Sequence, residues 1–414
     1  MTFFHRFRAV VRLAVISTAC IVSASVVNAT TYYVDASNGS DSGSGTSPAN
    51  AWRTISKVNN SSFQPGDSIL FQRGDVWNEM LVIPNAGTKS SPITYSAYGT
   101  GSKPSIDLNF NYPNGIRNRH SYIRISYIQI ENSSGHAITS YPSGWPNSHD
   151  DYIYDIWFDE MHIADVGGIG FFMSSIDTLH IKNSEMYRYG NNGIAIYGRT
   201  SHPIQHTWIT GKYGDSENSA AGGITYHRDA SGNPPGDHHI FSNNMFFNHT
   251  EEGVDAGVSD ILISDNVIGN NVYHGVAVTD GENIRILRNK IFNSGIGTGR
   301  AISIKTSNVL VAYNLVYDNC YRGIYVGDPP EDEGVCDNIN LFNNTVINPQ
   351  YEAVVISADD LNNFKMKNNI IYNTNTNRQI MNFSSNDFGS DSWDIDNNLY
   401  YVNNTSRLFY NSSS

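Results

Sequence analysis

Three carboxylic acids stand within five residues of one another in the middle of the chain: Glu251, Glu252 and Asp255. Close carboxyl groups push each other's pKa apart, so that one can carry a proton while the other is ionised. In such a pair the protonated group can donate to a leaving oxygen, while the ionised group activates water or attacks the substrate. We therefore predict Glu252 and Asp255 as the leading catalytic carboxylates, with Glu251 as a substitute.

Basic residues recur after these acids at regular intervals. Spacings of 22, 26 and 22 residues separate Glu252, His274, Arg300 and Arg322. Arginine is suited to bidentate recognition of a carboxylate or sulfate group. We predict that Arg300 and Arg322, together with Lys305, hold anionic groups of a substrate. His274 is predicted to orient a hydroxyl or a carboxylate group.

A sequence repeat must bring these residues together. From about residue 120 onward, an Asn, an apolar pair, a polar turn and a Gly-apolar-x-apolar segment recur. The Asn residues of the repeat, 22 to 30 positions apart, are Asn244, Asn266, Asn289, Asn314, Asn344, Asn369 and Asn398. The segments alternate apolar and polar residues at a period of two, which is typical of strands. Short strands at this interval predict a solenoid in which each repeat forms one turn, or rung, stacked on the next.

The pattern resembles that of right-handed parallel β-helices, which satisfy backbone groups at a turn with an internal Asn ladder. The segment Tyr32-Tyr33-Val34-Asp35 and its surroundings are similar to the start of many secreted β-helix proteins that act on polysaccharides. The resemblance implies an all-β fold, a right-handed parallel β-helix. Trp52, Ile55 and Val58 have helical spacing, so we expect a short N-terminal cap helix over the open end of the core.

Aligning the Gly-apolar-x-apolar segments predicts which side chains leave the core. The first predicted outward column is Gly170, Ala195, Thr225, Asp255, Ala277, Ser303, Tyr325 and Val355. The second is Phe172, Tyr197, His227, Gly257, Thr279, Lys305, Gly327 and Ser357. At the strand entrance the column is Gly167, Asn192, Gly222, Glu252, His274, Arg300, Arg322 and Glu352. Rungs lie about 4.8 Å apart, so these columns predict a groove for an extended polysaccharide. Its predicted substrate-binding residues are His227, Arg300, Arg322, Tyr325 and Tyr197, the tyrosines stacking on sugar faces.

Three short segments are similar to polygalacturonase-type hydrolases of the β-helix class. That family places an acidic pair before a strand, His-Gly in the next rung and Ile-Lys in the one after. The corresponding segments here are Glu251-Glu252-Gly253, His274-Gly275 and Ile304-Lys305. The resemblance is one of placement, and the family has Asp where this chain has Glu. The resemblance implies a hydrolase site. Because the predicted groove has no obvious end wall and carries Arg300, Lys305 and Arg322, we predict an endo-acting glycoside hydrolase for an acidic polysaccharide that bears uronate or sulfate groups, without a cofactor.

A polysaccharide lyase is the alternative. The segment Glu251-Glu252-Gly253-Val254-Asp255 is similar to the clusters that hold calcium in some β-helix pectate lyases. There a Lys, Arg or His removes the proton beside a uronate carboxylate. On this interpretation Lys305 or His274 is the base, and Glu251, Glu252 and Asp255 hold calcium. A non-catalytic carbohydrate-binding β-helix is the second alternative.

The termini and composition predict an exported protein. Residues 1–29 combine a basic start, an apolar stretch and a small residue before the cleavage point, as a signal peptide does. We assign residues 30–118 to the cap and first rungs, and residues 119–414 to the groove-bearing repeats. Cys320 and Cys336 then form an even pair in an oxidising compartment, which predicts a disulfide.

The net charge of −13 lacks the basic footprint that nucleic-acid binding requires. No segment after the signal peptide is long and apolar enough to cross a membrane. We therefore expect a secreted monomer whose partner is an acidic polysaccharide. Two inserts, 139–157 and 327–337, are predicted to wall the groove.

Overall fold

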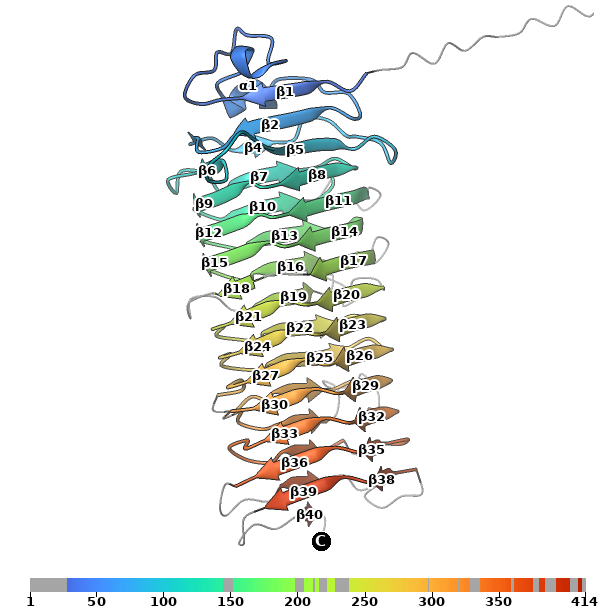
Figure 1. The fold of residues 1–414 in the computed structure, drawn as a ribbon. Helices are drawn as coiled ribbons and strands as arrows, with labels where there is room; N and C mark the ends of the chain where they lie inside the picture. The colour runs from blue at the N-terminus through green and yellow to red at the C-terminus, as the bar shows by residue number, and fades with distance from the viewer. Residues whose placement is uncertain are drawn as a thin grey trace, which may run out of the picture.

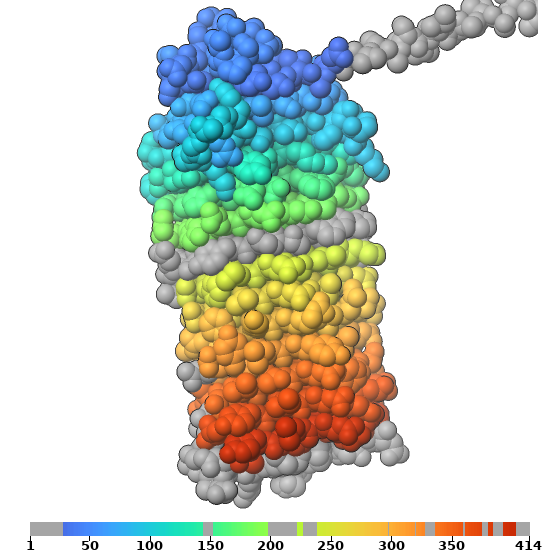
Figure 2. Space-filling view, viewed as in Figure 1, coloured from blue at the N-terminus to red at the C-terminus, as the bar shows by residue number. Residues whose placement is uncertain are grey.

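The computed structural model shows a parallel β-solenoid that rises rung by rung along one axis (Figure 1). It describes residues 28–143, 152–197, 205–210, 213–215, 222–227, 238–296, 298–318, 320–327, 336–358, 361–374, 380–383, 392–402 and 409–411. The rungs lie in sequence order from the N-terminal to the C-terminal end (Figure 2). Of the predicted signal peptide, only residues 28 and 29 belong to these ranges. The predicted division after residue 118 stays a prediction.

Three parallel sheets form the walls of the solenoid, each taking one strand from a rung. Sheet A contains β1 (Thr31–Val34), β2 (Ser68–Gln72), β5 (Ile93–Tyr98), β8 (Ile123–Ser126), β11 (Ile153–Asp159), β14 (Ile176–Lys182), β17 (Gln205–Thr210), β20 (His239–Ser242), β23 (Ile261–Ser264), β26 (Ile284–Leu287), β29 (Val309–Ala312), β32 (Ile339–Phe342), β35 (Lys365–Lys367) and β38 (Asp394–Asp396).

Sheet B contains β3 (Val76–Trp77), β6 (Ser105–Asp107), β9 (Gln129–Ser133), β12 (His162–Val166), β15 (Glu185–Tyr189), β18 (Tyr213–Asp215), β21 (Met245–Phe247), β24 (Val267–Gly269), β27 (Lys290–Phe292), β30 (Leu315–Tyr317), β33 (Thr345–Ile347), β36 (Ile370–Asn373) and β39 (Leu399–Val402). Sheet C contains β4 (Leu81–Val82), β7 (Asn114–Asn118), β10 (His136–Ser140), β13 (Phe171–Ser174), β16 (Ile194–Tyr197), β19 (Ile224–His227), β22 (Val254–Gly257), β25 (Val276–Asp280), β28 (Ile302–Ile304), β31 (Ile324–Val326), β34 (Val354–Ile356), β37 (Met381–Phe383) and β40 (Phe409–Asn411).

The core forms because alternate residues of each strand turn inward. In β23, for example, Ile261 and Ile263 are buried, and the same register places Ile284 and Ile286 of the next rung beside them. Burying such a side chain stabilises the fold by about 1.5–3 kcal/mol. The period-two prediction of an all-β parallel solenoid is therefore confirmed.

The predicted Asn ladder is also confirmed. Asn289 donates its backbone N–H and its side-chain Nδ2 to Oδ1 of Asn314, at 2.9 and 3.0 Å. Asn314 donates in the same two ways to Asn344. The pattern runs from Asn244 to Asn398. Each Asn thus satisfies a buried backbone donor of the preceding rung, which fixes the turn between sheets A and B.

Little helix is present in the described residues. A 3₁₀ turn, η1 (Pro48–Asn50), precedes one short helix, α1 (Ile55–Asn59), at the N-terminal end (Figure 1). Thr54 begins the helix by accepting the Lys57 N–H on its side chain, and Ile55 and Val58 are buried. The role of α1 as the predicted cap stays a prediction. No helix among the described residues has the length and apolar character to span a membrane.

The predicted disulfide is wrong, because Cys320 and Cys336 are not bonded to each other. The Cys320 thiol lies 3.6 Å from the carbonyl of Tyr317, whereas the Cys336 thiol lies 3.1 Å from the carbonyl of Thr306. Both side chains are buried, and burial raises the pKa of Cys320 to about 12. Each thiol behaves as a small apolar group of the core.

We therefore expect dithiothreitol to leave the melting temperature unchanged. Both thiols should react with a thiol reagent only after unfolding, because both are buried in the fold. A thiol titration of native and denatured protein measures this. A peptide containing Cys320 linked to Cys336 in a non-reducing digest would contradict the assignment.

Candidate active site

The acids lie on the outer face of sheet C in the predicted register. β22 pairs Asp255 with Thr225 of the preceding rung and with Ala277 of the following rung. The column continues through Ser303 to Tyr325. Backbone hydrogen bonds likewise align the strand entrances, since the carbonyls of Glu252, His274 and Arg300 accept N–H groups from successive rungs. The two predicted columns around the acids are therefore confirmed.

The first rung of the alignment is wrong by two residues. β13 pairs Phe171 with Ile194, so Phe172 stands beside Ala195 where Gly170 was predicted. At the strand entrance, Ile169 takes the position predicted for Gly167, because the next residue, Gly170, donates to the carbonyl of Asn192. Phe172 is nearly buried and packs against Tyr197 at 4.9 Å between ring centroids.

A β-bulge changes the register that was predicted for the second outward column. The register shifts between β22 and β25, so that Gly257 pairs with Asp280 and not with Thr279. The extra residue in β25 brings a fourth acidic side chain, Asp280, to the rung after Asp255. A Cβ on Gly257 would lie 3.6 Å from Oδ2 of Asp280, which places that carboxylate over the glycine. Sequence alignment missed Asp280 because a bulge leaves no mark in the apolar pattern.

The two leading carboxylates differ from ordinary surface acids. Glu252 precedes β22 and Asp255 lies within it, and both side chains are half-buried. Burial, reinforced by the charges of Asp255 and Glu251, raises the pKa of Glu252 to about 7. Burial and the nearby Glu251 raise the pKa of Asp255 to about 6. Glu251 is itself exposed. Both carboxyl groups therefore titrate closer to neutral pH than ordinary surface acids do.

His274 is a neutral group at this site. Its side chain is 5% exposed, and Nδ1 accepts the backbone N–H of Arg300 at 3.0 Å. Burial, with the charges of Arg300 and Lys305, lowers the pKa of His274 to about 3. Because Nδ1 is an acceptor, the ring proton resides on Nε2, and His274 can act there as a hydrogen-bond donor.

Within the described ranges, no ion pair joins Arg300 or Lys305 to an acidic side chain. The Arg300 guanidinium lies over the ring of Tyr325, 4.2 Å from its centroid. Among the described residues, its buried Nε has no hydrogen-bond partner. Lys305 follows β28 and is half-buried, and its charge acts on His274. Both remain candidates for an anionic substrate group.

The guanidinium of Arg322 is paired with a carboxylate of the protein. Its Nε donates to Oε2 of Glu352 at 2.8 Å, and Glu352 is buried. The guanidinium also lies over the ring of Tyr321. This ion pair between neighbouring rungs satisfies the charge that was predicted to face the substrate. Arg322 is therefore a weaker candidate than Arg300.

The two predicted tyrosines lie in different outward columns, on either side of the acids along the axis. Tyr325 accepts a hydrogen bond from Ser357 at 2.7 Å, and its ring fills the space over Gly327. Tyr197 lies two rungs before Asp255, in β16, and contacts Phe172. His227 pairs with Tyr197 along the backbone, but its side chain lies outside the described residues.

The predicted groove wall 139–157 is wrong in its C-terminal part. Tyr154 and Trp157 belong to β11, which is a strand of sheet A and not of the sheet that bears the acids. Residues 144–151 lie outside the described part of the chain. So do residues 328–335 of the second predicted wall.

The described residues contain no group of three His, Cys, Asp or Glu side chains that could hold a metal ion. The calcium site that the lyase alternative places on Glu251, Glu252 and Asp255 stays a prediction.

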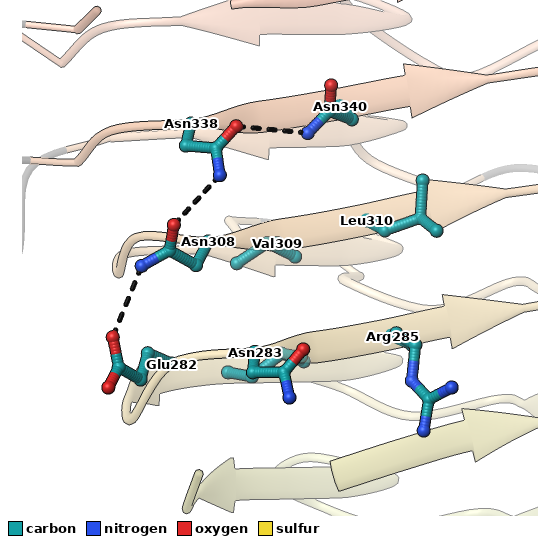
Figure 3. A pocket seen from close by; sticks show the side chains of 9 residues that line it. Glu282, Asn283, Arg285, Asn308, Val309, Leu310, Asn338 and Asn340 are labelled. Atoms are coloured by element: carbon teal, nitrogen blue, oxygen red, sulfur yellow. Dashed lines mark hydrogen bonds between the residues drawn. The ribbon is translucent and has the colours of Figure 1, made fainter. Parts of the chain in front are cut away.

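A second depression, on sheet A, has a structural explanation. It has a volume of about 340 Å³ and is lined by residues of β26, β29 and β32 and their turns, most of them polar (Figure 3). Asn338 donates to Asn308 at 2.8 Å, and Asn308 donates to Glu282 at 3.2 Å. These side chains form hydrogen bonds with one another from rung to rung. The depression therefore results from the stacking of the turns before sheet A.

The sequence matches the family described as "Right handed beta helix region" over residues 154–304 and 235–406. The chain belongs to this family. A segment of 86 residues is 41% identical to a lacto-N-biosidase from Bifidobacterium longum subsp. longum, and covers 19% of this chain and 5% of that protein. The β-helix chain thus spans only a small part of this relative's length.

Two solved structures share the fold. A GH87 alpha-1,3-glucanase catalytic domain is 13% identical, with a TM-score of 0.56, over 90% of this chain and 69% of that one. A PL6 family alginate lyase is also 13% identical, with a TM-score of 0.54, over 89% of this chain and 53% of that one. Because one is a hydrolase and the other a lyase, the fold does not choose between the two reactions.

Proposed function

We propose that this protein is a secreted carbohydrate-active enzyme, an endo-acting glycoside hydrolase that cleaves an acidic polysaccharide on the outer face of sheet C. The observation that carries the proposal is the pair Glu252 and Asp255, whose pKa values are raised to about 7 and about 6. The 86-residue similarity to a lacto-N-biosidase supports a glycosidase activity.

In this proposal Glu252 is the general acid. It is the carboxyl group that keeps its proton near neutral pH, and it protonates the oxygen of the leaving sugar. Asp255 is ionised under the same conditions and activates water or attacks the anomeric carbon. Nε2 of His274 donates to a substrate hydroxyl or carboxylate. Arg300 and Lys305, which stand shortly before and directly after β28, bind anionic groups two rungs further along.

Hydrolysis is preferred to β-elimination because a suitable base is lacking. His274 uses Nδ1 to accept the Arg300 N–H, and its low pKa makes it a weak base. Lys305 lies two rungs from Asp255, which corresponds to about 10 Å along the axis. The described residues also contain no group of three His, Cys, Asp or Glu side chains that could hold a Ca²⁺ ion beside either base.

A panel of polysaccharides tests the proposal. Polygalacturonate, alginate, sulfated galactans and neutral glucans would be digested, and new reducing ends followed together with the ultraviolet absorbance of unsaturated sugars. We expect reducing ends from an acidic polymer without that absorbance. Absorbance that disappears on chelation of calcium would establish the lyase instead. Binding with no new ends on any polymer would establish the non-catalytic β-helix.

The activity should show a bell-shaped pH dependence. As pH rises through about 6, Asp255 loses its proton and kcat/KM increases. As pH rises through about 7, Glu252 loses the proton that it must donate, and kcat/KM falls. Initial rates at low substrate concentration between pH 4 and pH 9 give the profile. An activity that is constant above pH 8 would contradict the assignment of Glu252 as the acid.

A further inference from the structure

Another pocket, separate from the depression in Figure 3, lies on the outer face of sheet A near the N-terminal end of the solenoid. It is formed where the strands β8, β11 and β14 follow one another, and Figure 1 shows the order of these strands. Its volume is about 390 Å³. The lining residues are Lys89, Tyr122, Arg124, Tyr154, Asp155, Trp157, Asp177, Thr178 and His180. The acids of the candidate active site belong to sheet C, so this pocket opens on a different face.

The pocket interrupts a regular feature of the solenoid. One column of sheet A has positive φ in many of the described rungs, and from the middle of the solenoid onward its members with positive φ are His238, Asp260, Asn283, Asn308, Asn338 and Asn363. Figure 3 shows Asn308 and Asn338 joined by a hydrogen bond. Asn tolerates this conformation well.

At the pocket the same column contains different residues. Tyr122, Asp155 and Thr178 occupy it, with φ of 60°, 57° and 69°. A bulky or β-branched residue in this region is an outlier that costs about 1–3 kcal/mol. A structural role alone would be met at lower cost by Asn, as it is further along the chain. Tyr122 and Thr178 thus retain a backbone strain that Asn would relieve, and both side chains line the pocket.

Aromatic rings supply apolar surface in the pocket. The rings of Tyr122 and Tyr154 lie in adjacent rungs, nearly parallel at 17°, with centroids 6.4 Å apart. Tyr154 is 42% exposed, and Tyr152 packs against it at 5.9 Å. Trp157 lies deeper, held between the guanidinium of Arg124 and the ring of His180 at 4.7 and 4.0 Å.

The polar groups of the pocket are fixed in place. Arg124 donates to the carboxylate of Asp155 at 2.5 Å and to its carbonyl at 2.7 Å. Trp157 donates its Nε1 to the other carboxylate oxygen at 2.6 Å. Such preorganised groups can bind a hydroxyl group without a further loss of side-chain freedom.

The charges of the lining residues are mixed. Lys89 and Arg124 carry two positive charges, and Asp155 and Asp177 carry two negative ones. Lys182 adds a positive charge at 4.4 Å from the centroid of the Trp157 ring. Burial lowers the pKa of His180 to about 4, so this ring is neutral at pH 7. Apolar ring faces beside fixed donors and acceptors match the two faces of a neutral sugar.

We propose that this pocket binds a neutral sugar residue of a polysaccharide, at a site separate from the groove in which cleavage is proposed. Tyr122 and Tyr154 contact the apolar face of the sugar, and Arg124 and Asp155 bind its hydroxyl groups. The site holds the polymer on the solenoid without cleaving it. This binding does not depend on Glu252 or Asp255 being catalytic.

Native affinity electrophoresis tests the proposal on the full chain. The gels contain laminarin, galactomannan, xylan, soluble starch or hydroxyethyl cellulose, and all proteins carry Glu252→Gln to prevent digestion. The test variant combines Tyr122→Asn with Tyr154→Ala, because Asn preserves the positive φ that it adopts at Asn283. Tyr313→Ala is the matched control, since Tyr313 is 62% exposed and also has positive φ at the edge of sheet A. Arg300→Ala reports binding in the sheet C groove.

We expect at least one neutral polymer to retard the parent protein, the Tyr313→Ala control and the Arg300→Ala variant. The Tyr122→Asn/Tyr154→Ala variant should bind that polymer at least 10-fold more weakly, with a melting temperature no lower than that of the parent. The proposal is overturned if no neutral polymer retards the parent, if the double variant is retarded equally, or if only Arg300→Ala loses binding. Failure of the hydrolase proposal would instead appear as absent cleavage by wild-type protein, with retardation intact.

Discussion

Replacement of Glu252 by Gln should lower kcat/KM by about 10²- to 10⁴-fold, the range expected for loss of a general acid. Gln has nearly the same shape as Glu, but it cannot donate a proton to the leaving oxygen. Asp255→Asn should have a loss of similar size, because the amide cannot activate water or attack. Rates of reducing-end release on the polymer cleaved by the wild type measure both effects.

The stability of the Glu252→Gln variant is the internal control. In the unfolded chain Glu252 loses its proton near pH 4.5, whereas in the fold it keeps the proton until about pH 7. Between these values the folded state binds more protons than the unfolded state, so its stability falls as pH rises. The variant should therefore melt on the order of 2 °C higher than the wild type at pH 8 and at the same temperature at pH 4. Full activity in both amide variants would show that the groove is wrongly assigned.

Replacement of Asn314 by Ala should destabilise the fold by about 3–5 kcal/mol. Oδ1 of Asn314 accepts two hydrogen bonds from Asn289, and its Nδ2 donates to the carbonyls of Ile286 and Ala312 and to Asn344. The substitution leaves buried donors of Asn289 without an acceptor, and this costs more than the hydrogen bonds themselves contribute. The shift of the urea midpoint measures the loss.

Asn340→Ala is the matched control for the ladder. Asn340 lies on the outer face of β32 and makes one long hydrogen bond, at 3.4 Å, to Asn338 (Figure 3). We expect a change of less than about 1 kcal/mol, because its amide remains partly solvated. If Asn314→Ala and Asn340→Ala shift the midpoint equally, the ladder does not contribute as described.

Much of the fold could be predicted because the repeat carries the information in two independent patterns. The strands follow from the period of two, and the turn follows from the Asn that recurs at each rung. The alignment failed at one rung because Gly168-Ile169-Gly170-Phe171 and Gly170-Phe171-Phe172-Met173 both fit the same Gly-apolar-x-apolar pattern. Only backbone pairing distinguishes the two registers.

The site was less predictable than the fold. The columns placed Glu252 and Asp255 together, but the bulge that brings Asp280 to the next rung adds one residue without changing the apolar pattern. The pairing of Arg322 with Glu352 could have been found, because the two residues are adjacent in one predicted column and have opposite charges. Cys320 and Cys336 show the limit of counting cysteines, since an even number does not give the geometry of a bond.

One comparison tests the central claim most directly: the products that the wild type and Glu252→Gln release from one acidic polysaccharide, followed by reducing ends and by ultraviolet absorbance. The account predicts reducing ends without unsaturated sugars from the wild type, and at least a 100-fold slower release from the variant. Equal rates from the two proteins, or unsaturated products from the wild type, would contradict it.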